Sequence, residues 1–188
     1  MRINLYKISV PRFVNTLRNL EGMLIIAEKH ANDSDVDQTY FSHLSLHQDM
    51  MPLYKQVKLA CDNCVRWVNL VKDDTTSADL IKIPYIDPND AGVAIPYLRS
   101  RVRKNISFFE WLSYGDIIRI DVRADKIITI TNHYGSLYSA TALDMLINHT
   151  LPNLYFHCTT TYNILRRHGV DIGKADYLSS HPWEATLI

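Results

Sequence analysis

The chain has 188 residues, of which 47% are hydrophobic, and its 20 basic residues balance 20 acidic ones. This is enough apolar material for one buried core without a metal or disulfide. Zero net charge gives no overall attraction to nucleic acid or to an anionic membrane. No apolar stretch approaches the ~20 residues that span a bilayer, and no secretory leader is evident. We therefore expect a single domain over residues 1–188, located in the cytoplasm, without a nucleic-acid or membrane partner.

A first helix is predicted to begin at Ser9-Val10-Pro11, because a serine can cap a helix and a proline is tolerated in the first turn. Apolar residues then recur at alternating spacings of four and three, which places them on one helical stripe. They are Phe13, Leu17, Leu20, Leu24, Ala27 and Ala31. The polar run 32–35 ends this helix.

Two further amphipathic helices are predicted. The second follows Asp49 and Pro52, and its stripe comprises Leu53, Val57, Ala60, Cys61, Cys64, Val68 and Val71. The polar run 72–77 ends it, and residues 78–88 are expected to be irregular because they contain two prolines. The third helix begins between Asp90 and Pro96 and ends before Gly115. Its stripe comprises Ile95, Leu98, Val102, Ile106, Phe109 and Leu112.

A β-hairpin is predicted between the third and fourth helices. Ile118, Ile120 and Val122 alternate with charged residues, and the run 126–131 is rich in β-branched residues. These two segments are expected to pair with each other. A two-stranded ribbon is marginal alone, so we expect it to pack on the helices or on a second subunit.

Ser139 is predicted to cap the fourth helix, which ends at Gly169. Its stripe comprises Leu143, Leu146, Leu151, Leu154, Tyr155, Cys158, Tyr162 and Leu165. Pro152 removes one helical hydrogen bond and crowds the carbonyl of Asn148. We therefore expect either a kink near Asn148 or two abutting helices.

The three cysteines, Cys61, Cys64 and Cys158, lie within apolar helical patterns, which is typical of reduced and buried thiols. Cys61 and Cys64 have the spacing of a redox pair, but such pairs lie at a helix N-terminus, where the thiol pKa is lowered. No second pair supplies the spacing of a zinc finger. We therefore expect buried thiols rather than a redox or zinc site.

A polar row follows one face of the fourth helix, with His149, Asn153, His157 and Thr161 at intervals of four. An unsatisfied buried polar group costs ~1 to 3 kcal/mol, so the row must be hydrogen-bonded or hydrated. Two interpretations stay open. The row faces solvent or pairs with the carbonyl freed by Pro152, or it lines a pocket between helices. His149 and His157 lie ~12 Å apart along the helix, too far to share one metal ion.

The sequence resembles an uncharacterised domain-of-unknown-function branch of the DinB-like four-helix-bundle superfamily. The residues that carry this resemblance are Leu151–Thr160 (LPNLYFHCTT), Tyr162–Arg166, Gly169–Leu178, Tyr6–Phe13, Asp49–Leu53 and Gln56-Val57. They cover most of the chain. The resemblance implies an up-and-down bundle with a long crossover, frequently a homodimer. Together with the predicted hairpin, the expected fold is an all-α, DinB-like four-helix bundle with a small β-hairpin between helices three and four.

Characterised members of that superfamily often hold a divalent metal with three histidines, and some are thiol transferases or related enzymes. By motif position, His157 matches the second histidine of the fourth-helix pair, and Asn153 stands where the first would be. Asp49, with His47 as the alternative, matches the helix-two histidine. The resemblance thus implies a degenerate site of Asp49, Asn153 and His157. Such a site would hold a divalent ion weakly, because amide oxygen is a poor replacement for imidazole.

Two functions follow. In the first, a non-catalytic bundle, as a monomer or a dimer, binds a small molecule or a protein partner through the groove of the fourth helix, with no cofactor and five pocket candidates. These candidates are Asp49, His149, Asn153, His157 and Thr161. In the second, a divergent metal-dependent transferase or hydrolase acts on a small molecule, with His157 as general base or ligand oriented by Asp49 and Asn153. A solvent-facing His157 would exclude a site inside the bundle.

Overall fold

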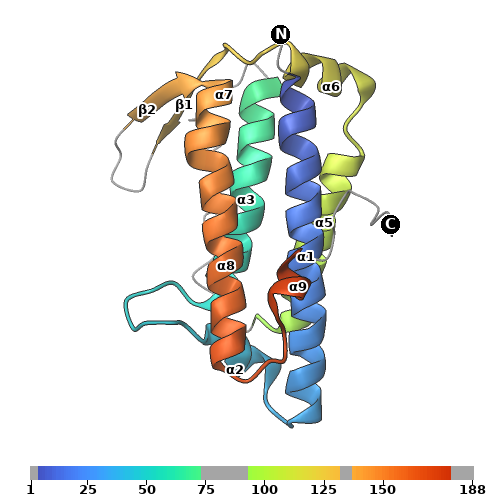
Figure 1. Ribbon diagram of the computed structural model, residues 1–188, viewed down its shortest axis with the longest axis vertical. Helices are drawn as coiled ribbons and strands as arrows, with labels where there is room; N and C mark the ends of the chain where they lie inside the picture. Colours follow the sequence, from blue (N-terminus) through green and yellow to red (C-terminus); the bar gives the residue numbers. More distant parts are fainter. Residues whose placement is uncertain (1–3, 73–92, 132–136, 179–188) are drawn as a thin grey trace, which may run out of the picture.

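The computed structural model describes residues 4–72, 93–131 and 137–178, and most of them are helical. Among these residues, four long helices run along the length of the molecule (Figure 1). They are α1 (Leu5–Asp33), α3 (Leu53–Lys72), α5 (Ile95–Glu110) and α8 (Leu151–Arg167). α3 packs mainly against α8, and α1 packs mainly against α5. The expected all-α bundle with a small hairpin is confirmed. The predicted helix stop after residue 72 and the irregular segment 78–88 lie outside the described residues.

The predicted apolar stripes form the core. Every residue of the first two stripes is fully buried, and the third is buried from Ile95 to Phe109. Phe13 lies at the centre, with its ring centroid 5.8 Å from that of Trp67 and 5.7 Å from that of Phe109. It therefore joins α1, α3 and α5. The fourth stripe is less uniform, because Tyr155 is 40% exposed.

The first helix begins earlier than predicted, so the expected cap at Ser9 is wrong. Asn4 is the N-cap, and its side chain accepts a hydrogen bond from the Lys7 N–H at 2.8 Å. Pro11 consequently lies inside the helix and cannot donate to the Lys7 carbonyl four residues before it. Arg12 Nη1 donates to that carbonyl instead, at 3.0 Å. The side chain thus compensates for the hydrogen bond that the proline removes.

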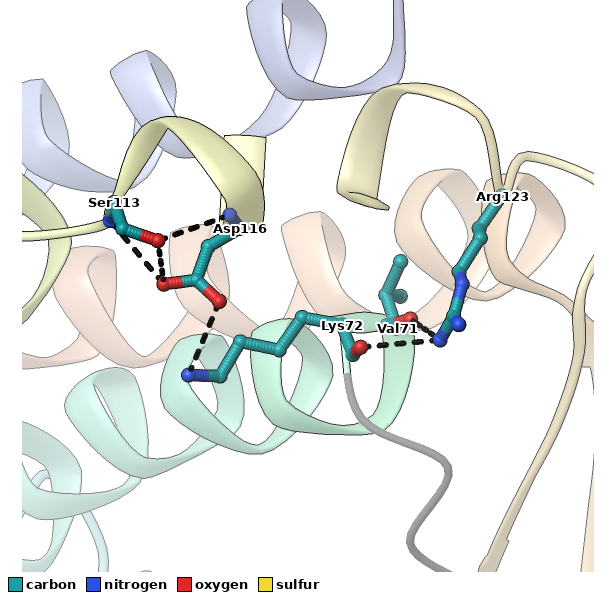
Figure 2. A network of polar contacts seen from close by, with 5 residues as sticks. All are labelled: Val71, Lys72, Ser113, Asp116 and Arg123. Carbon is teal, nitrogen blue, oxygen red and sulfur yellow. Dashed lines mark hydrogen bonds and ion pairs between the residues drawn. The ribbon is translucent and has the colours of Figure 1, made fainter. Parts of the chain in front are cut away.

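The first strand of the expected hairpin, over residues 118–122, is also wrong, because this segment forms helix α6 (Tyr114–Asp121). Ser113 and Asp116 make a capping box, in which each side chain accepts from the backbone N–H of the other. This local signal outweighs the alternation of apolar and charged residues. The Asp116 carboxylate also lies 3.8 Å from the ammonium of Lys72 at the end of α3 (Figure 2).

Basic side chains that follow α6 close the C-terminal end of α3. Arg123 Nη1 donates to the carbonyls of Val71 and Lys72, at 3.0 and 3.1 Å (Figure 2). Lys126 Nζ donates to the carbonyl of Leu70, at 3.0 Å. The last carbonyls of a helix have no partner within it, so these bonds satisfy groups that would otherwise need water.

The hairpin consists of β1 (Ile127–Thr131) and β2 (Leu137–Thr141), paired antiparallel with Thr129 opposite Ser139. The strand expected over residues 126–131 is therefore confirmed, but its partner follows it in the chain. The inward side chains Ile128 and Ile130 are buried. This places the hairpin against the bundle at the same end as α6 (Figure 1).

The fourth helix is composed of three consecutive segments: α7 (Ala142–Met145), the π-helix η2 (Leu146–Thr150) and α8. The expected cap at Ser139 is wrong, because Ser139 lies in β2 and the hydroxyl of Thr141 accepts from the Asp144 N–H at 3.1 Å. The irregularity expected near Asn148 takes the form of the π-helix. Pro152 follows it in the first turn of α8, where its missing N–H is tolerated.

The described residues also form two short helices. α2 (Gln38–His43) lies between α1 and α3, and α9 (Lys174–Leu178) packs on α1. Asn19 Nδ2 of α1 donates to the carbonyl of Tyr177 at 2.8 Å, which holds α9 in place. Among the described residues, no helix is both long and apolar enough to cross a membrane.

Candidate functional site

His157 of α8 faces α3 and is only 8% exposed. Its Nδ1 atom lies 2.7 Å from Oε1 of Gln56, a buried residue of α3. The amide nitrogen of Gln56 donates to the Met51 carbonyl at 2.8 Å, so the amide oxygen is the atom that faces the imidazole. An oxygen of this kind only accepts hydrogen bonds. His157 therefore carries its proton on Nδ1, and its Nε2 atom presents a lone pair.

Burial lowers the pKa of His157 from 6.5 to about 4. The imidazole is therefore neutral at neutral pH. Its Nε2 atom is not among the fully buried, unpartnered side-chain atoms of the described residues, so water or a ligand can reach it. His157, the third residue of the polar row, therefore faces the inside of the bundle. A solvent-facing His157 would have excluded a site inside the bundle, and the structure does not show that arrangement.

Thr161 lies one helical turn after His157 on the same face of α8 and is fully buried. Its hydroxyl has no hydrogen-bond partner among the described residues. A buried hydroxyl without a partner is costly, which makes it a marker of an unusual environment. Together the two side chains offer a neutral acceptor and a hydroxyl that can both donate and accept.

The first two residues of the polar row, His149 and Asn153, make contacts different from those of His157 and Thr161. Asn153 Nδ2 donates to the carbonyl of His149 at 2.7 Å, within its own chain segment. This resembles the expectation that the row pairs with backbone near Pro152, although the carbonyl is that of His149 rather than Asn148. His149 is half-buried, and its pKa is lowered first by burial and then by the charge of Arg66. It lines a small pocket together with Asn63 and Arg66 of α3.

Asp49 lies on the surface before α3. Its carboxylate accepts from Nδ1 of His47 and its side chain is 78% exposed, whereas His157 is buried against Gln56. In residues 4–72, 93–131 and 137–178, no group of three or more His, Cys, Asp or Glu side chains is placed to hold a metal ion. The mixed set of Asp49, Asn153 and His157 stays a prediction, but the structure pairs His157 with Gln56 rather than with Asp49.

Gln56 is a site residue that the sequence did not predict. It lies in a segment that carries the family resemblance, but that resemblance implies a histidine or a carboxylate on helix two. The available signal was position, since Gln56 directly precedes Val57 of the buried stripe and follows Leu53 by three residues. A polar residue at such a position needs a buried partner.

The cysteines behave as predicted, because Cys61, Cys64 and Cys158 are all free and buried. Burial raises the pKa of Cys61 to about 12 and raises the pKa of the other two thiols as well. A thiol is nucleophilic only as the thiolate. These side chains therefore contribute packing rather than nucleophiles.

Comparisons with known proteins agree with this architecture. The profile of a family described as a domain of unknown function (DUF1993) matches residues 5–178. The crystal structure of a DinB family member from Shewanella denitrificans is 31% identical and superposes with a TM-score of 0.76, over 96% of this chain and 95% of that chain. No curated protein matches the sequence. The chain therefore belongs to the DUF1993 family, a domain of unknown function with the fold of the DinB proteins.

Proposed function

We propose that this chain is a binding protein that holds a small polar molecule at His157 and Thr161, without metal-dependent catalysis. The observation that carries the proposal is the buried hydrogen bond from His157 Nδ1 to Gln56, which fixes one tautomer and leaves Nε2 as an acceptor. The unpartnered Thr161 hydroxyl is fully buried one turn further along α8. A ligand that donates to Nε2 would bond to this hydroxyl as well only if the side chains that cover it move.

The low pKa of His157 favours binding over base catalysis. A general base is most effective when its pKa lies near the operating pH. With a pKa of about 4, the imidazole would hold an abstracted proton poorly at neutral pH. It remains a good neutral acceptor for a hydroxyl or amide of a ligand.

A divergent metal-dependent transferase or hydrolase is the second candidate. The Nδ1-protonated tautomer of His157 supports this candidate too. Histidines that bind metals commonly donate from one ring nitrogen to an oxygen and coordinate the metal through the other. Gln56 performs the orienting part of that arrangement for His157. In this reading, Asp49 or Asn153 would have to approach Nε2 to complete an ion site.

Elemental analysis and ligand-induced thermal shifts distinguish the two candidates. The protein is purified without chelator or affinity-tag metal, together with His157→Ala, Asp49→Ala and Thr161→Val. The proposal expects no stoichiometric metal, and small polar compounds that raise the melting temperature in the presence of EDTA, with the shift lost in His157→Ala and kept in Asp49→Ala. Near-stoichiometric metal that disappears in both alanine variants would instead favour the enzyme.

The homodimer and the cytoplasmic location stay predictions. An exposed apolar face supports self-association: Trp111 is 85% exposed and Tyr114 is 79% exposed, and Ile118 and Val122 continue the face along α6. Exposed apolar residues at spacings of four lie on one helix face, and an exposed apolar face commonly marks an interaction site. Sedimentation analysis would measure the oligomeric state directly.

A further inference from the structure

A pocket lies about two helical turns from His157, where α3, the π-helix η2 and β1 meet. Its rim is polar and half-buried, with Asn63 and Arg66 from α3 and His149 from η2. Its floor is buried and largely apolar, and includes Trp67, Ile130 and Met145. The enclosed volume is about 10 Å³, which is room for one water-sized or methyl-sized group.

The π-helix places His149 at this rim. Trp67 Nε1 donates to the Ala142 carbonyl at 3.0 Å and so fixes α7 against α3. In the next turn, the Leu151 N–H bonds to the Leu146 carbonyl, five residues back, so the turn contains one residue more than an α-helical turn. The extra residue shifts His149 around the helix axis relative to His157. His149 thus lines this pocket, whereas His157 bonds to Gln56.

The charge at the rim is uncompensated. Arg66 makes no hydrogen bond and no ion pair with any residue in the described ranges, and no acidic side chain lines the pocket. Arg101 on the neighbouring helix shows the usual arrangement, with its guanidinium 2.6 Å from the Asp62 carboxylate. Burial and the charge of Arg66 lower the pKa of His149, so its imidazole is neutral at neutral pH. A neutral imidazole offers one N–H donor and does not repel the Arg66 guanidinium. The rim therefore presents donors and one positive charge.

We propose that this pocket binds a short-chain monocarboxylate, with its carboxylate on Arg66 and His149 and its alkyl end on the apolar floor. An arginine is well suited to a carboxylate because its planar fork can donate two parallel hydrogen bonds. The size of the pocket limits the enclosed part to about one methyl group. An inorganic anion would bond to Arg66 and His149 at the rim but would place no apolar group on the floor. An uncharged alcohol would place its alkyl group on the floor but would bring no negative charge to Arg66.

Nuclear magnetic resonance titration of the full chain tests this proposal. Propionate, inorganic phosphate and 1-propanol are added at equal ionic strength, and the indole N–H of Trp67 and the ring protons of His149 are followed. We expect propionate to shift both signals saturably, more tightly than phosphate, and 1-propanol to have little effect. We also expect bound propionate to raise the pKa of His149, because the carboxylate offsets the charge of Arg66.

Matched variants make the result specific. Arg66→Gln should weaken propionate binding by at least about tenfold, the loss of one charged hydrogen bond. Arg166→Gln, which removes an equal charge at the far end of α8, should change it by less than about twofold. Equal affinity for phosphate and propionate, an equal loss in both variants, or no saturable shift in a folded protein would each overturn the proposal.

Discussion

At the scale of single residues, the imidazole of His157 decides how this protein responds to acid. Its pKa is about 4 in the folded chain and 6.5 when unfolded, so between these values the unfolded chain binds more protons. The free energy of unfolding contributed by this residue is fully present above pH 6.5 and is lost as the pH falls toward 4. His149 and His168, whose pKa values are also lowered, act in the same direction.

Urea unfolding at a series of pH values checks this expectation. In the native protein, stability should fall steadily from about pH 6.5 to about pH 4. In His157→Gln the decline should be shallower, because His157 no longer takes up a proton on unfolding. Some decline should remain, because His149 and His168 are still present. An unchanged slope in the variant would mean that His157 titrates normally in the folded protein.

Thr161→Val is predicted to stabilise the protein or leave it unchanged, which is unusual for a buried polar-to-apolar substitution. The hydroxyl has no partner among the described residues, so its removal costs no hydrogen bond and relieves a desolvation penalty of about 1 kcal/mol. Thermal unfolding measures the change. If Thr161→Val binds ligand more weakly while its melting temperature rises, the hydroxyl contributes to ligand binding rather than to stability. A loss of stability would indicate that it has a bonding partner in solution.

At the scale of helices, α6 depends on its first turn. Ser113→Ala removes the side chain that accepts the Asp116 N–H, and should lower the free energy of unfolding by about 1 kcal/mol. Ser107→Ala is the matched control, because Ser107 is exposed in the interior of α5, where alanine is at least as favourable as serine. Chemical denaturation of both variants gives the comparison. Equal effects would show that the cap is not stabilising.

The helices could be predicted where their signals are local, and not where distant residues supply the partners. The stripe from Phe13 to Ala31 is a local repeat, and it was found correctly. The start of α1 has a local signal in Asn4, which accepts from the Lys7 N–H, but Ser9-Val10-Pro11 offers a competing one. The Asp121 carboxylate, more than a hundred positions later, accepts from Asn4 Nδ2 and from the Tyr6 N–H, each at 2.8 Å, and no short window of sequence contains that contact.

At the scale of the whole molecule, the reaction rate of the three buried cysteines reports how often the whole chain unfolds. Cys61, Cys64 and Cys158 are each no more than 1% exposed. We predict that a thiol reagent reacts with the native protein only as fast as the protein unfolds, and at once in denaturant. Ser107→Cys supplies an exposed thiol that should react quickly in the folded state. Rapid reaction of the native cysteines would show that α3 and α8 separate locally.

The candidate site could be predicted only in part from the sequence. The row containing His157 and Thr161 was identified from spacing alone, because both residues lie on one helix. Gln56 and Arg66 belong to another helix, and their relation to the row depends on how α3 packs against α8. The separation of His149 from His157 depends in addition on the π-helix, which an even spacing of four residues cannot reveal.

The closure of α3 by Arg123 and Lys126 bears on how the chain acquires its structure as it is synthesised. The carbonyls of Leu70, Val71 and Lys72 accept from residues 51 to 56 positions later. Until Arg123 and Lys126 emerge from the ribosome, these three carbonyls lack the side-chain donors that they have in the folded chain. A fragment that stops after α5 would contain three of the four long helices without the two basic side chains that bond to the end of α3.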